Sequence, residues 1–176
     1  MTIKQFEDLI ISELTKVVND IVKGNSNVDI SAKSRAGAEI SDWLEEKFVE
    51  ATNKHKYFHS SEFAPKSKTK HPWDAKTTFK HKGVSENIYI DFKAFKVSND
   101  DSNPKMGSPD KIIELINGNN FYHTFIFVYY ESIQNSIRFA RKDKKYVRGF
   151  FMKDINKSFY RDSTNQLQVN FAKPSE

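Results

Sequence analysis

Two amphipathic helices are predicted at the start of the chain. Apolar residues recur every three or four positions over residues 3–22, behind Thr2 as a candidate N-cap and before Gly24 as a stop. A second stripe of the same period spans residues 36–52, with Ser34 as a candidate cap. The residues between the two helices are polar, so the chain opens with a helical region.

A hairpin is predicted after these helices. Residues 53–72 are basic, contain two prolines and show no period, which predicts a surface loop. Polar and apolar residues then alternate over 75–82, which indicates a strand with one wet face, and 82–85 form a turn. The apolar stretch 86–97 is rich in Ile, Tyr, Phe and Val and is predicted to be the returning strand.

The second half of the chain predicts one more helix and further strands. Ser108 is a candidate N-cap followed by proline, and Gly118 closes that helix. Residues 121–130 are almost wholly apolar, which indicates a central strand covered on both faces. A basic strand pair is predicted over 136–151. The element order predicts an α/β protein with a mixed central sheet of about five strands flanked by helices.

Length and composition fit a single domain. The chain has 176 residues, 38% of them hydrophobic, which is enough for one core and excludes a disordered chain. We expect a helical part at 1–52, a core at 34–130 and a basic part at 131–176. Cysteine is absent, which excludes disulfides and thiolate chemistry. Acidic residues within 1–24 argue against a signal peptide or membrane span, so a cytoplasmic protein is expected.

Basic charge is concentrated in two stretches. Residues 54–82 carry a net charge of +6 and residues 138–161 a net charge of +7, although the whole chain carries only +5. Such a distribution is typical of a surface that binds a polyanion, but lysine-rich loops that merely keep a protein in solution give the same pattern.

Candidate chemistry lies on the two strands of the predicted hairpin. Side chains two apart on a strand share a face, so Asp91 and Lys93 stand side by side in an otherwise apolar strand. Asp74 lies at the mouth of the preceding strand, and folding of the hairpin can bring its carboxylate near that of Asp91. Paired carboxylates are oxygen ligands that suit Mg²⁺. The alternative for Asp91 and Lys93 is a buried structural ion pair.

The motif Pro72-Trp73-Asp74, followed by Asp91-Phe92-Lys93 after the apolar residues 88–90, resembles the PD-(D/E)XK nuclease superfamily, and particularly small type II restriction endonucleases. Residues 34–39 (SRAGAE) are similar to a helical segment of some restriction enzymes in which a glutamate approaches the metal site. The resemblance covers residues 34 to about 130 and implies a restriction-endonuclease-like core.

The resemblance also implies the roles of the site residues. Asp74 and Asp91 would hold one or two Mg²⁺ per active site, and Lys93 would orient or help deprotonate the attacking water. Glu39 and the backbone carbonyl of Phe92 are further candidate metal ligands. The expected activity is hydrolysis of phosphodiester bonds in double-stranded DNA at a short, specific, palindromic sequence. Cutting both strands of a palindrome with one active site per subunit predicts a homodimer.

Basic residues of the two stretches, with one arginine and one histidine near the motifs, form the candidate DNA-binding set: Arg35, Lys68, Lys70, His71, Lys76, Lys80, Arg138, Arg141, Lys142, Lys144, Lys145 and Arg148. Two other functions stay open at this point. One is a structure-specific or repair nuclease of the same superfamily, and the other is a basic nucleic-acid-binding module without catalysis.

Overall fold

The computed structural model describes residues 1–30, 36–65, 71–98, 105–119, 122–154, 159–161 and 167–169. The helices are α1 (Ile3–Gly24), α2 (Ala36–Thr52), α3 (Pro109–Asn117) and the short 3-10 helix η1 (Met152–Asp154). The strands are β1 (Asn27–Val28), β2 (Phe58–Phe63), β3 (Ala75–His81), β4 (Val84–Lys96), β5 (Lys105–Gly107), β6 (Tyr122–Ile133), β7 (Ser136–Phe139), β8 (Val147–Phe151), β9 (Phe159–Arg161) and β10 (Leu167–Val169).

The main sheet has seven strands in the order β1-β7-β6-β4-β3-β2, with β8 also paired to β6. Strands β4 and β6 are parallel, and the other pairs of this sheet are antiparallel. The chain between the parallel strands carries α3, as expected for a crossover connection. The prediction that the apolar stretch near residue 125 forms a central strand is confirmed, because β6 has β4 on one side and both β7 and β8 on the other.

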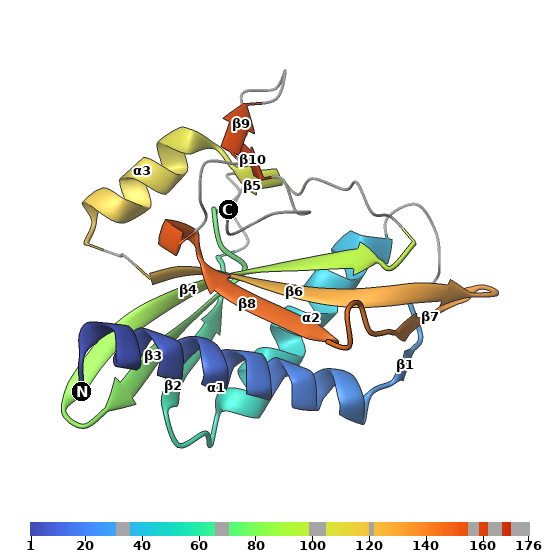
Figure 1. The fold of residues 1–176 in the computed structure, drawn as a ribbon, viewed down its shortest axis with the longest axis horizontal. Coiled ribbons are helices and arrows are strands. Elements are labelled where there is room, and N and C mark those ends of the chain that lie inside the picture. Colours follow the sequence, from blue (N-terminus) through green and yellow to red (C-terminus); the bar gives the residue numbers. More distant parts are fainter. Residues whose placement is uncertain are drawn as a thin grey trace.

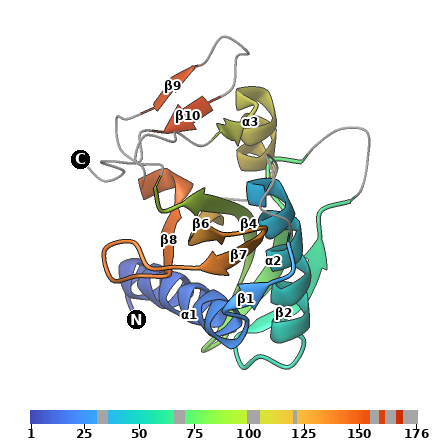
Figure 2. The same cartoon turned by 90° about the vertical axis from the view of Figure 1, so that its right-hand side faces the viewer.

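Two helices pack together on one side of this sheet (Figure 1, Figure 2). The side chains of Ile88, Ile90 and Phe92 on β4 point towards them and join a core with α1 and α2. The ring of Phe92 lies 5.7 Å from the ring of Phe48 on α2. Helix α3 and a small sheet of order β5-β10-β9 lie on the other side (Figure 1). The predicted mixed α/β architecture is therefore confirmed.

The helix boundaries follow from local signals in the sequence. Helix α1 starts with a reciprocal capping box, in which Gln5 N–H donates to the Thr2 hydroxyl (3.2 Å) and Thr2 N–H donates to the Gln5 side chain (2.8 Å). Helix α3 begins directly after Ser108, although the Ser108 hydroxyl makes no capping bond. Ser34, the candidate cap of α2, lies outside the described residues.

The prediction that residues 53–72 form only a loop is wrong, because β2 lies within them. This strand pairs with β3 at the edge of the sheet, and Phe58 is its one buried residue. A register shift between His59 and Glu62, where Ser60 has a φ of 52°, breaks its alternation. An exposed, bulged edge strand has neither the apolar run nor the period two by which strands are recognised.

Among the described residues, no helix is both long and apolar enough to cross a membrane.

Candidate active site

Asp74 directly precedes β3 and lies against β4. The first β3 residue, Ala75, pairs with Ile90, whereas β4 continues to Lys96. Asp74 N–H donates to the Ile90 carbonyl (2.7 Å), and the Asp74 carboxylate accepts the Phe92 N–H (2.7 Å). The Asp74 carboxylate thus accepts a β4 backbone hydrogen bond that lies beyond the paired residues of β3. This backbone bond fixes the carboxylate at the level of residues 91–93.

Asp91 and Lys93 complete a cluster with Asp74. The Asp91 side chain forms an ion pair with the Lys93 ammonium, and a hydrogen bond links the carboxyl groups of Asp91 and Asp74. Asp91 is only 4% exposed, whereas the Lys93 side chain is 25% exposed. The structure therefore brings together the three groups that the sequence placed on neighbouring strands.

Burial dominates the electrostatics of this cluster. It raises the pKa of Asp91 to about 8, because neither the ammonium of Lys93 nor any other neighbour offsets the lost hydration and the negative charge of Asp74. Burial also raises the pKa of Asp74, against the opposing effects of Lys93 and the Phe92 N–H. Burial alone would lower the pKa of Lys93, but the two carboxylates outweigh it and raise that pKa.

Aromatic rings wall the cluster on both sides. Trp73, the residue between Pro72 and Asp74, packs edge-on against Tyr89 with ring centroids 5.4 Å apart. Phe95 packs in the same way on Phe127, also at 5.4 Å. These apolar walls keep the carboxyl groups out of bulk water, which strengthens every charge interaction between them.

Helix α2 crosses β4 beside the cluster. The Ser41 hydroxyl lies 3.1 Å from the Phe92 carbonyl and 3.0 Å from the Gly37 carbonyl, so one of these bonds ties α2 to the strand. The α2 carboxylate whose charge acts on Asp74 is Asp42, which contributes to the raised pKa of Asp74. Glu39, one turn earlier, is exposed. Its role as a metal ligand stays a prediction.

Sequence reasoning missed a buried histidine next to the cluster. His123 on β6 is 2% exposed, and its Nδ1 lies 3.3 Å from the Met152 sulfur. Burial, with a smaller effect from the charge of Lys93, lowers the pKa of His123 to about 4 against the opposing effect of a hydrogen bond with the Pro72 backbone. The register pairs it with Tyr89, so it shares the face of Asp91. In the sequence, the signal for this residue was a histidine within the otherwise almost wholly apolar stretch 121–130.

The donor atoms of the cluster fit Mg²⁺. Burial, together with the negative charge of Asp74, raises the pKa of Asp91 despite the ammonium of Lys93. A divalent cation can take the place of the proton on Asp91. No group of three or more His, Asp or Glu that could hold a metal occurs in the described part of the chain. Mg²⁺ commonly binds one or two carboxylates, with waters and phosphate oxygens as its other ligands, so two suffice.

Four candidate DNA-binding residues share the face of Asp91. Residues paired across a sheet point to the same side. Lys76 pairs with Tyr89, Lys80 with Ser85, Arg138 with Glu131 and Arg148 with Phe127, which itself pairs with Lys93. Three of them have acidic neighbours. Glu62 binds Lys76 (3.2 Å), Asp143 binds Arg148 (2.6 Å), and Glu131 binds Arg138. Lys80 is exposed.

The other members of that set fall in three places. The exposed His71 ring packs on Trp73, with centroids 5.3 Å apart. The prediction that residues 136–151 form a strand pair is wrong, because the described strands β7 and β8 each pair with β6 and not with each other. The turn that joins them carries the remainder of the set: Arg141, Lys142, Lys144 and Lys145. The candidates Arg35, Lys68 and Lys70 lie outside the described residues.

A mixed sheet with two helices on one face, and a carboxylate pair beside a lysine at the end of a β-hairpin, define a restriction-endonuclease-like α/β protein. Residues 2–176 match the SwaI-like family, described as SwaI restriction endonuclease, and the chain belongs to this family. It is therefore a nuclease, and its substrate is DNA. A comparison with curated proteins gives no match.

Proposed function

We propose that this single-domain protein is a Mg²⁺-dependent type II restriction endonuclease. It cuts both strands of double-stranded DNA at a short palindromic sequence and acts as a homodimer. The observation that carries the proposal is the convergence of Asp74, Asp91 and Lys93 at the start of β3, in a chain of a restriction endonuclease family.

Asp74 and Asp91 would hold the metal, with the Phe92 carbonyl as a further oxygen at the same level of β4. When bound, Mg²⁺ supplies Lewis-acid activation of a water and neutralises charge on the phosphate. The Phe92 N–H holds the Asp74 carboxylate in place, so this ligand is oriented before the substrate arrives. The hydrogen bond that Ser41 can make to the Phe92 carbonyl fixes the other edge of the site.

Lys93 acts as a cation in this proposal. Its pKa is raised by Asp91 and Asp74, so its ammonium is charged at neutral pH and can orient a water and stabilise negative charge that builds on the phosphate. The walls around Tyr89 and Phe95 exclude water, which makes that stabilisation stronger than it would be at the surface.

The face that carries Asp91 is the DNA-binding face in this proposal. Lys76, Lys80, Arg138 and Arg148 lie on it by strand register and surround the cluster on both sides. Such side chains bind phosphates without regard to sequence and set the position of the duplex. The bond to be cut would then meet the carboxylate pair.

The test is digestion of a mixed-sequence plasmid by purified protein, in Mg²⁺ and in EDTA, beside Asp91→Asn. We expect a set of discrete fragments from the wild type in Mg²⁺ alone. Cutting that depends on junctions or damage in the DNA would instead support a repair or structure-specific nuclease. DNA binding without cleavage would support a binding module. Equal cutting by Asp91→Asn would remove the assignment of the site.

A further inference from the structure

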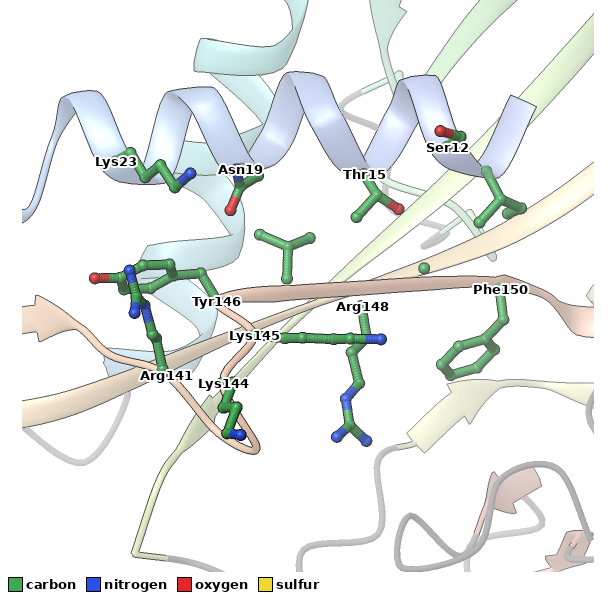
Figure 3. Close-up of a pocket in the computed structure, with 13 residues that line it drawn as sticks. Ser12, Thr15, Asn19, Lys23, Arg141, Lys144, Lys145, Tyr146, Arg148 and Phe150 are labelled. Atoms are coloured by element: carbon green, nitrogen blue, oxygen red, sulfur yellow. The ribbon is translucent and has the colours of Figure 1, made fainter. Parts of the chain in front are cut away.

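A second charged site lies at the far edge of the sheet. A pocket of about 740 Å³ opens between α1 and the connection from β7 to β8, whose tip is a short hairpin closed by a bridge between Lys142 and Lys145 (Figure 3). Helix α1 contributes polar side chains from successive turns: Ser12, Thr15, Asn19 and Lys23. Their spacing places them on one side of the helix, opposite the hairpin. The helix therefore offers hydroxyl, amide and ammonium donors to one cavity.

The pocket is strongly basic. Five cationic side chains line it: Lys23, Arg141, Lys144, Lys145 and Arg148. No Asp or Glu is among the described residues that line it. Arg148 binds Asp143 (2.6 Å), which offsets one of the five charges and leaves an excess of about four. An excess of this size in a confined space attracts a ligand with several negative charges.

The hairpin holds its cations on a rigid turn. Asp143 and Lys144 have φ values of 49° and 66°, and the flanking Lys142 and Lys145 exchange two backbone hydrogen bonds of 2.9 and 3.0 Å. Two successive residues in the left-handed region within such a pair are typical of a tight type I′ hairpin turn. The lysines at its tip are therefore presented from a fixed backbone.

Close contact between α1 and β8 forms the floor of the pocket. A side chain at Gly149 would lie 2.9 Å from the Thr15 hydroxyl and 2.9 Å from Ile126. Only glycine lets the helix approach the strand so closely. This close approach places the donors of α1 beside the cations on and next to β8, and both groups line the pocket.

The pocket continues onto the face of the candidate active site. Arg148 pairs with Phe127, and Phe127 pairs with Lys93, so the three residues form one row across the sheet. Two strand spacings, about 10 Å, separate the backbones of Lys93 and Arg148. Figure 3 shows Arg148 and Phe150 on the side of β8 away from α1, whereas Thr15 and Lys23 approach from α1.

We propose that this pocket binds backbone phosphates of the DNA at positions that flank the bond to be cut. The proposal rests on the DNA substrate of the proposed function and adds a separate anchoring site. Phosphates of one strand follow each other every 3.4 Å along the helix axis, so a duplex at Lys93 presents further phosphates at the distance of Arg148. The exposed lysines bind them as point charges.

The test measures binding of a fluorescein-labelled mixed-sequence duplex by fluorescence anisotropy in EDTA, over a range of salt concentrations. The double variant Lys23→Gln/Lys145→Gln is compared with Lys16→Gln/Lys82→Gln, which removes the same charge from exposed positions outside the pocket. Log affinity falls with log salt by about 0.9 per phosphate contact. We expect the pocket variant to lose about 1.8 of this slope, and the control to keep the wild-type slope.

A near-isosteric variant checks the location. Asn19→Asp adds one carboxylate inside the pocket, and Asn53→Asp adds one at the exposed end of α2. Only Asn19→Asp is expected to weaken DNA binding.

A second experiment measures thermal unfolding in the presence of millimolar dAMP. Stabilisation by dAMP that the pocket variants abolish, together with unchanged DNA slopes, would assign the pocket to free nucleotides and overturn the proposal.

The two proposals fail separately. Because binding is measured without metal, an active Asp91→Asn would remove the catalytic assignment and leave the pocket result intact. Wild-type slopes in both pocket variants would overturn the pocket and leave the catalytic assignment intact.

Discussion

The carboxylate pair and the basic pocket are two concentrations of charge on one sheet, and they are built in opposite ways. Beside the start of β3, Asp91 on β4 is almost completely buried, and its pKa depends on this burial and on the charges of Lys93 and Asp74. At the β7–β8 turn, Lys144 and Lys145 are exposed and held apart by a tight hairpin. One region confines charge in an apolar pocket, and the other presents charge to solvent.

This difference separates chemistry from binding. Charges in a dry site interact strongly, so the loss of one group changes the ionisation of the others, and the effects of substitutions are not additive. Exposed charges are screened by salt and contribute almost independently. We therefore expect the first region to respond to single substitutions with large changes in rate, and the second to respond gradually and in proportion to ionic strength.

The largest effect is expected for Lys93→Ala. This variant removes the ammonium that balances the two carboxylates, and loss of a charge-stabilising group lowers the cleavage rate by at least about 10²-fold. Single-turnover cleavage of plasmid in Mg²⁺ measures it. Lys96→Ala is the matched control, because Lys96 lies on the same strand with its side chain on the opposite face. Similar losses in both variants would show that β4 tolerates no truncation and that the effect is not catalytic.

The second prediction concerns packing under the basic pocket. Gly149→Ala places a methyl group 2.9 Å from Thr15 and Ile126, and overpacking of this kind costs about 1 to 3 kcal/mol. For a chain of this size, that lowers the midpoint of thermal unfolding by roughly 2 to 4 °C per kcal/mol. Gly37→Ala is milder, because its methyl would lie 3.3 Å from the Ala94 carbonyl and alanine favours the helix. Equal midpoints for the two variants would contradict the close approach of α1 to β8.

The third prediction follows from the raised pKa of Asp91. The folded metal-free protein keeps the Asp91 proton up to about pH 8, whereas an unfolded chain releases it near 3.8. The unfolded state therefore gains stability relative to the folded state as the pH rises through this window. Asp91→Asn lacks this penalty and retains Asp74 as the partner of Lys93. In EDTA, its unfolding midpoint should exceed that of the wild type at pH 8, and the gap should close towards pH 4. A gap independent of pH would contradict the buried proton.

Local periodicity was sufficient to predict the position of the carboxylate pair. A hairpin returns on itself, so Asp74 and Asp91 had to meet once the two strands and their turn were recognised. The capping box of α1 and the apolar run of β6 were equally local signals. These parts depend on residues close in sequence, whose spacing reports the structure directly.

The remaining features depend on contacts between distant segments. Strand β8 shares one edge of β6 with β7, and nothing in residues 147–151 specifies that partner. The basic pocket needs α1 beside a strand more than 120 positions later in the chain. The mostly exposed strand β2 is recognisable only from its pairing with β3. The face that α2 turns to β4 is set by packing, so the effect of Asp42 on the pKa of Asp74 could not be read from the sequence, and the role of Glu39 stays a prediction.

The smallest effect is expected on that helix, and it decides between Asp42 and Glu39 as the carboxylate that acts on the proposed metal site. Asp42 acts on Asp74 through space, so Asp42→Asn removes negative charge near the proposed metal site and is expected to weaken its attraction for Mg²⁺. We expect the Mg²⁺ concentration for half-maximal thermal stabilisation to rise several-fold. Glu39→Gln, one turn away and exposed, should change it less than twofold. A larger change for Glu39→Gln would mean that Glu39 reaches the metal when it binds, as the likeness to restriction enzymes predicts.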